Sequence, residues 1–236
     1  MEPHDQVMRL FHMLLSAGEP VTLLNNYRGF PVSHQATILA LEQGYVAIGI
    51  HEHQAVSMAL EGKTFIQSSW LPEVVRAAVM AVDVVKKRAV LTEFEPGGSE
   101  IGKRTTIRVF PREQLEADIY DGRRRMSGKV ADISTSGVGV FTFAAYVYGD
   151  LSFEQNKEVY VDIRLPTTDA VVRFHGVVTS VAVKQDAHLH RLGVHIFPNP
   201  EVQPLLDAYI HQRQEETERE LTLIFQSMCQ ERVLQG

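Results

Sequence analysis

Two arginines carry the chemistry that this sequence suggests most strongly. Arg104 and Arg108 stand four residues apart in a segment that concentrates positive charge. A guanidinium group binds phosphate through two parallel hydrogen bonds and also stacks on the flat face of a purine. Two such groups on one adaptable segment predict a site that grips a nucleotide through its phosphates and its bases.

A second motif, Asp132-Ile133-Ser134, ends a predicted strand, and Gly137 follows three residues after the serine. A carboxylate, a hydroxyl and the N–H groups of a tight turn can bind a guanine edge and a phosphate. The glycine lets a ligand approach the backbone without a clash with Cβ. Taken alone, the motif is better explained as a turn held by side-chain-to-backbone hydrogen bonds. Together with the arginines, it predicts ligand binding.

The charge distribution favours a small anion as the ligand. The 236-residue chain has a net charge of -6, yet residues 103–129 carry 8 basic and 4 acidic groups. The flanking segments are acidic, with 7 basic and 11 acidic groups in residues 1–102 and 8 and 14 in residues 130–236. A protein that coats nucleic acid or an anionic membrane is basic over a broad face. A discrete anion therefore fits better than a nucleic acid polymer.

Composition and length limit the class of protein. Apolar residues make up 44% of the chain, enough to bury a sizeable core. The single cysteine, Cys229, excludes an intramolecular disulfide and indicates a reducing compartment. No apolar stretch reaches the roughly 20 residues that a membrane span needs, and the N-terminus lacks the basic region of a signal peptide. We expect a cytoplasmic protein without a membrane span.

The elements that must position the motifs fall into two β-rich regions. Residues 4–17 place apolar side chains at helical spacing, and residues 51–62 predict a short second helix. Segments rich in Val, Ile, Thr and aromatic residues, punctuated by Gly, Asn and Pro, predict strands in the rest of residues 1–95. The Pro/Gly-rich segment 96–103 is expected to be a linker.

Residues 104–199 predict six or so short strands with no helix between them, hence an antiparallel barrel or sandwich. Residues 200–236 predict a helix with two apolar stripes separated by the polar segment 211–220. The first stripe can cover the barrel. The second is a candidate surface for self-association or for docking a target protein, unless the chain folds back onto its own N-terminal domain. The second stripe consists of Leu221, Ile224, Phe225 and Met228.

The two motifs together resemble the signature of the PilZ domain family, cytoplasmic bacterial receptors for cyclic di-GMP. That signature is R-x-x-x-R followed some tens of residues later by [D/N]-x-S-x-x-G. Here it is R-T-T-I-R from Arg104 and D-I-S-T-S-G from Asp132. The resemblance covers about residues 100–200, including the late segment RLGVHIF. It implies a six-stranded antiparallel barrel that holds its ligand at the outer surface.

The resemblance also implies a role for each motif residue. The two arginines would hold phosphates and guanine faces, the Asp and Ser would read a guanine and its phosphodiester, and the glycine would shape the turn. The family position before the first arginine influences whether one ligand or a stacked pair binds, and the charge of a lysine at this position favours the pair. The expected ligand-binding residues are Lys103, Arg104, Arg108, Asp132, Ser134 and Gly137.

Some family members, the flagellar-brake proteins, carry an N-terminal split barrel joined to PilZ by a short linker, and residues 1–95 resemble it in length and strand content. The expected fold is thus mainly β, with two barrel domains and a C-terminal helix. The expected function is a cyclic di-GMP receptor without catalysis, which changes its domain orientation and signals to a protein partner such as the flagellar motor or other output machinery in motility or biofilm formation. The alternative is a PilZ-like adaptor with weak or no ligand binding.

Other candidate sites have simpler explanations. The run at residues 123–125 is expected to be a solvated hairpin turn. The histidine pair 51 and 53 and the group at 188, 190 and 195 lack a carboxylate or cysteine that would complete a metal site. Ser134 lacks the base and the elbow motif of a nucleophile. A flavin enzyme built on the N-terminal barrel would need a phosphate loop that residues 1–95 do not show. No catalytic residue, metal ligand or cofactor is therefore predicted.

Overall fold

The computed structural model describes residues 3–42, 44–97, 106–123, 125–143, 147–148, 154–166, 170–184, 189–197 and 199–235. The chain divides into two compact units. The first consists of Met1–Tyr27, Pro31–Thr105 and Glu216–Gly236, and the second consists of Arg28–Phe30 and Thr106–Glu215. Lys103 and Arg104 of the expected site, and most of the expected linker, lie outside the described residues.

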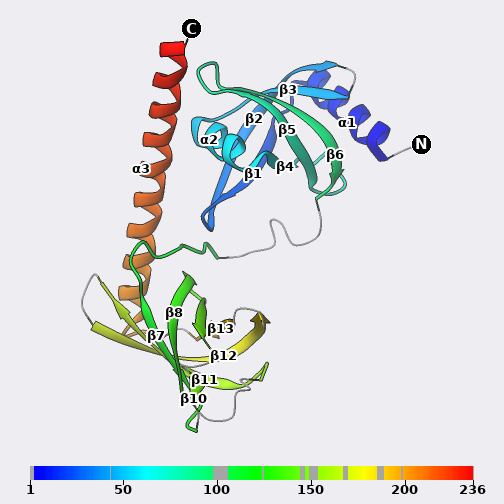
Figure 1. The fold of residues 1–236 in the computed structure, drawn as a ribbon. Helices are drawn as coiled ribbons and strands as arrows, with labels where there is room; N and C mark the ends of the chain where they lie inside the picture. Colours follow the sequence, from blue (N-terminus) through cyan, green and yellow to red (C-terminus); the bar gives the residue numbers. More distant parts are fainter. Residues whose placement is uncertain are drawn as a thin grey trace. The chain divides into compact units, whose positions relative to one another are not determined.

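The first unit is a closed antiparallel barrel with the strand order β1-β2-β3-β6-β5-β4 (Figure 1). Side chains alternate between core and surface along β1, where Val21 and Leu23 are buried, as a half-buried strand requires. Phe11 and Leu14 of the N-terminal helix complete this core. The strands are β1 (Val21–Tyr27), β2 (Phe30–Glu42), β3 (Tyr45–Gly49), β4 (Lys63–Gln67), β5 (Val75–Asp83) and β6 (Arg88–Pro96).

Two helices accompany this barrel, α1 (Pro3–Ala17) and α2 (Glu52–Glu61). Helix α2 begins after His51, whose side chain caps its N-terminus, and ends at Gly62, which has the left-handed backbone (φ 66°) that favours glycine. Both helices match the sequence-based expectation. Strand β6 continues through Pro96, which was expected to open the linker, because a proline can end a strand where no N–H is needed.

The second unit is a six-stranded barrel with one short additional strand (Figure 1). Its sheet order is β10-β8-β7-β11-β12-β13-β9, and pairing of β8 with β9 closes the ring. The architecture is therefore a barrel and not a sandwich, as the resemblance implied. The strands are β7 (Glu116–Tyr120), β8 (Arg125–Ser134), β9 (Gly137–Phe143), β10 (Val147–Tyr148), β11 (Glu158–Leu165), β12 (Ala170–Lys184) and β13 (Leu189–Ile196).

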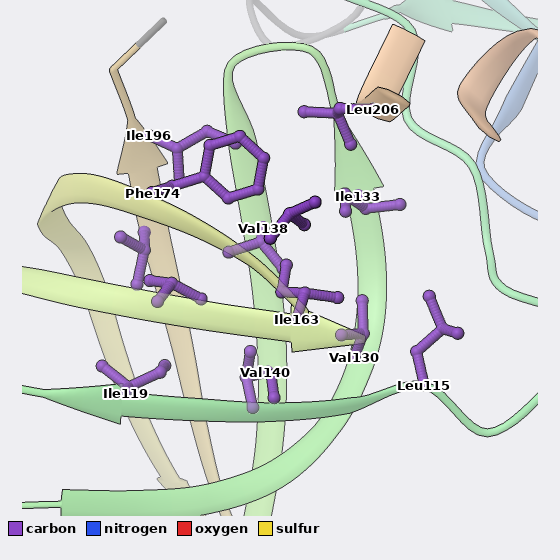
Figure 2. Close-up of a cluster of buried hydrophobic side chains, with 14 of the residues drawn as sticks. Leu115, Ile119, Val130, Ile133, Val138, Val140, Ile163, Phe174, Ile196 and Leu206 are labelled. Atoms are coloured by element: carbon purple, nitrogen blue, oxygen red, sulfur yellow. The ribbon is translucent and has the colours of Figure 1, made fainter. Parts of the chain in front are cut away.

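The core of the second barrel consists mainly of aliphatic side chains, with Phe174, Met126 and Tyr209 among the other buried residues that the structure describes. Figure 2 shows Ile119, Ile163 and Phe174 pointing into this core, where all three are fully buried. Leu206 of the C-terminal helix packs into the same cluster (Figure 2). Full burial of side chains of this size stabilises a fold by about 1.5–3 kcal/mol each. The core therefore fixes the strands whose outer faces carry the site.

The C-terminal helix α3 (Gln203–Gln235) is continuous and contributes to both units. Its second apolar stripe makes contacts within its own chain, as the fold-back alternative expects. Leu221 is 0% exposed and belongs to the first unit. The Tyr27 hydroxyl donates to Glu220 Oε1 (2.8 Å), and Lys87 Nζ lies 5.3 Å from the centroid of the Phe225 ring. These contacts involve part of the stripe, and self-association or docking of a target protein stays a prediction.

None of the helices within the described part of the chain combines the length and the apolar character needed to cross a membrane.

Candidate ligand-binding site

A β-bulge in β8 presents the Asp-Ile-Ser motif at the outer surface of the second barrel. The register of β8 against β9 shifts between Val130 and Asp132, which leaves Ala131 as an extra residue. Val130 and Ile133 both belong to the core, although three residues apart they would face opposite sides of a regular strand. The bulge thus keeps both side chains inside and places Asp132 and Ser134 on the other face.

Arg108 is held beside Asp132 by a short backbone pairing. The Val109 N–H donates to the Ile133 carbonyl (2.9 Å), and the Ile133 N–H donates to the Val109 carbonyl (3.0 Å). Arg108 Nη1 then lies 3.5 Å from Asp132 Oδ1, a long contact for an ion pair. The Asp132 side chain is only 9% exposed, whereas that of Arg108 is 42% exposed. The structure therefore brings these two expected residues together, with the arginine at the surface.

Arg191 completes this group, and the sequence interpretation missed it. Its Nη2 lies 2.5 Å from Asp132 Oδ2, and its guanidinium carbon lies 5.7 Å from the centroid of the Phe141 ring. The carboxylate of Asp132 therefore sits between two guanidinium groups, and the trio carries one net positive charge. Alternation along β13, where Leu192 and Val194 are buried, predicts that Arg191 points outward. It does not predict which residue lies beside it.

Glycines line the surface between these charged side chains. In register across β8, β9 and β13, Asp132 pairs with Gly139, and Gly139 pairs with Gly193. A Cβ added to Gly139 would lie 2.7 Å from Asp132 Oδ2, so a side chain there would displace the carboxylate. The Asp132–Arg191 ion pair thus needs a glycine at position 139.

Ser134 and Gly137 flank the turn between β8 and β9. Gly137 opens β9 without the positive φ that would make it a turn-shaping residue, and a Cβ there would lie 3.3 Å from the Val194 carbonyl. The Ser134 hydroxyl is buried, donates to the Gly137 carbonyl (3.3 Å) and accepts the Ser136 N–H (3.4 Å). In this structure Ser134 therefore holds the turn, as the simpler explanation of the motif requires.

The arginine run after residue 121 belongs to a hairpin turn. The Arg123 N–H donates to Asp121 Oδ1 (3.0 Å), and Gly122 has φ 88°. Arg125 Nη2 lies 2.7 Å from Asp118 Oδ2 at the surface. The described residues of this run fit the expected solvated turn, and Arg124 lies outside the described residues.

The fold and the site define a β-barrel domain with a carboxylate held between guanidinium groups on its outer face. Residues 102–212 match the PilZ domain family, and this part of the chain is a PilZ domain. The identification from the two motifs is confirmed. Proteins of this family are cyclic di-GMP receptors.

Solved structures similar to the chain include the inhibitor of motility MotI/DgrA from Bacillus subtilis, which is 16% identical over 84% of this chain and 97% of its own, with a TM-score of 0.43. The MrkH–c-di-GMP complex from K. pneumonia is 13% identical over 92% of this chain and 96% of its own (TM-score 0.44). YcgR in complex with c-di-GMP from Escherichia coli is 13% identical over 94% of this chain and 93% of its own (TM-score 0.43). The sequence has no significant match among curated proteins.

Proposed function

We propose that this protein is a cytoplasmic receptor for cyclic di-GMP that performs no chemistry of its own. The ligand binds at the outer face of the PilZ barrel, where β8, β9 and β13 meet. Membership of residues 102–212 in the PilZ family supports the ligand class. The acidic chain with one basic segment supports a discrete anion over a nucleic acid polymer.

The observation that carries the proposal is the position of Asp132 between Arg108 and Arg191. Arg191 holds Oδ2 at 2.5 Å, which orients the carboxylate, while Oδ1 faces Arg108 across 3.5 Å. A guanine edge presents adjacent N–H donors that suit a carboxylate acceptor. Arg108 is exposed enough to exchange its long contact for a charge-assisted bond to a phosphodiester or for stacking on a guanine face.

The remaining residues of the expected set complete the proposed site. Arg104 supplies a second guanidinium for the phosphates, and Lys103 favours a stacked pair of ligands through its charge. Gly137 leaves room for the ligand beside the backbone, because it offers no Cβ toward the outer face. Ser134 acts by holding the turn that presents these groups.

Binding is proposed to act as a signal by changing the relation of the two units. The Arg104–Arg108 segment follows directly on the segment that joins them in sequence. Ordering of that segment around a ligand favours one arrangement of the domains over others, and a partner that recognises this arrangement reads the signal. The proposed partner is a protein of the flagellar motor or of other output machinery.

Isothermal titration of the purified protein with cyclic di-GMP tests this function. We expect saturable binding that Arg108→Ala weakens by roughly ten- to a hundredfold, since a charge-assisted hydrogen bond is worth about 1.5–3 kcal/mol. Arg104→Ala is expected to have a similar effect. Arg173→Ala is the matched control, because Arg173 forms a bidentate ion pair with Asp162 on the same barrel, outside the proposed site. Absence of binding to the wild-type protein would favour the adaptor alternative.

A further inference from the structure

Three histidines from separate parts of the sequence converge in the first unit. His34 lies on β2, His51 precedes α2, and His53 lies in the first turn of α2. Each offers a ring nitrogen, and these nitrogen atoms all lie within 4.8 Å of one another. The sequence predicted no metal site here because no nearby carboxylate or cysteine completes a set with His51 and His53. The fold of the N-terminal barrel instead brings a third histidine, His34, to the pair.

The rings pack around a common point. His34 stacks on His51 with 3.8 Å between ring centroids, and His53 stands edge-on to both, at 5.9 Å from His34 and 5.0 Å from His51. All three side chains are partly buried, so they are shielded but remain within reach of a small ion. A set of imidazoles without carboxylates suits a transition metal and not Mg²⁺ or Ca²⁺, which prefer oxygen ligands.

A neighbouring hydroxyl orients one of these rings. His53 Nε2 lies 3.0 Å from Thr222 Oγ1 of α3. The Thr222 hydroxyl donates to the Glu218 carbonyl (3.1 Å), so Oγ1 is left to accept the N–H of His53 Nε2. This places the lone pair of His53 on Nδ1. Histidines that bind metals characteristically donate their other ring N–H to such an acceptor, which fixes the tautomer and the ring orientation.

We propose that His34, His51 and His53 form a binding site for a divalent transition-metal ion of the Zn²⁺ type, with solvent as a fourth ligand. Three protein ligands and one open position are typical of zinc sites that keep an exchangeable ligand. Binding requires the stacked rings of His34 and His51 to separate. It also changes the cap of α2, because His51 Nδ1 now accepts the His53 N–H (3.2 Å). Metal binding is thereby coupled to the start of α2 and, through Thr222, to α3.

Titration of the full-length, untagged and chelator-treated protein with Zn²⁺ tests the site, with Co²⁺ as a spectroscopic probe. We expect one equivalent to bind and Co²⁺ to give the visible absorption of a four-coordinate site. His34→Gln and His53→Gln should each weaken binding at least tenfold. His12→Gln, which removes an exposed histidine of α1, is the matched control and should leave binding unchanged.

Thr222→Val tests the orientation of His53. The substitution keeps the shape of the side chain but removes the acceptor, and we expect roughly ten- to a hundredfold weaker Zn²⁺ binding. Thr222→Ser, which keeps the hydroxyl, should restore most of the affinity. Stoichiometric binding that survives both His34→Gln and His53→Gln, or no Zn²⁺ or Co²⁺ binding to the wild-type protein, would overturn the proposal.

Discussion

Arg191 Nη2 lies 2.5 Å from Asp132 Oδ2, although 59 residues separate the two in sequence. Their strands, β13 and β8, are not neighbours, because β9 runs between them. The side chains reach each other across β9 at Gly139, whose missing Cβ leaves the space that they occupy. This single relationship links a glycine, a buried carboxylate and an arginine that the motif does not include.

Arg191→Ala is expected to weaken cyclic di-GMP binding by roughly ten- to a hundredfold. The arginine orients a carboxylate that is 9% exposed, and it contributes half of the positive charge that flanks this carboxylate. Loss of a charge-assisted hydrogen bond costs about 1.5–3 kcal/mol. Calorimetric titration measures the effect, with Arg173→Ala as the control of equal charge change. Equal affinities of Arg191→Ala and the wild-type protein would remove Arg191 from the proposed site.

Gly139→Ala should destabilise the PilZ barrel more than Gly137→Ala does. The new Cβ would lie 2.7 Å from Asp132 Oδ2 and 3.2 Å from Arg191 Nη2, so the ion pair must move. At position 137 the nearest atom, the Val194 carbonyl oxygen, is 3.3 Å away. Overpacking of this kind costs about 1–3 kcal/mol in the free energy of unfolding. Urea denaturation measures the free energy of unfolding of the two variants. Equal losses of stability would show that the Asp132–Arg191 contact over Gly139 does not require a glycine there.

The sequence predicts the strands of this protein better than the neighbours of each strand. Alternation in residues 158–165 correctly predicts β11, because a two-residue period follows from the geometry of one strand alone. The same reasoning predicts that Arg191 faces outward. That Arg191 meets Asp132 depends on two registers, β13 on β9 and β9 on β8, and one of these contains a bulge. No local pattern in the sequence encodes such a combination.

Because local patterns do not encode which elements become neighbours, the sequence also did not predict the histidine cluster or the contacts of the C-terminal helix. The spacing of His51 and His53 is visible in the sequence, but their approach to His34 depends on how β2 and α2 meet in the closed barrel. Helical spacing correctly predicts an apolar stripe around Leu221. It does not predict what covers the stripe, because periodicity describes one face of an element and not its partner.

Cyclic di-GMP is expected to make the molecule more compact in solution. The arginine segment lies between the two units in sequence, and its attachment to a ligand on the barrel restricts the arrangements that the units can adopt. Small-angle scattering at saturating ligand should give a smaller radius of gyration than scattering without ligand. Arg108→Ala is the control and should show a smaller change at a ligand concentration that just saturates the wild-type protein, because it binds the ligand more weakly. Superimposable wild-type curves with and without ligand would argue against this mechanism of signalling.

Leu221→Ala is expected to destabilise the first unit strongly, whereas Leu223→Ala is not. Leu221 is 0% exposed and Leu223 is 65% exposed. Both variants replace leucine by alanine on the same helix, so they share the change in helix propensity and differ in the burial of the side chain. Removal of a fully buried leucine side chain costs about 2–5 kcal/mol, whereas a surface substitution usually changes stability by less than about 0.5 kcal/mol. Chemical denaturation measures both free energies of unfolding, and light scattering of the same samples reports the assembly state. If Leu221→Ala instead dissociates an oligomer without a loss of monomer stability, the stripe is an interface between copies and not a contact with its own barrel.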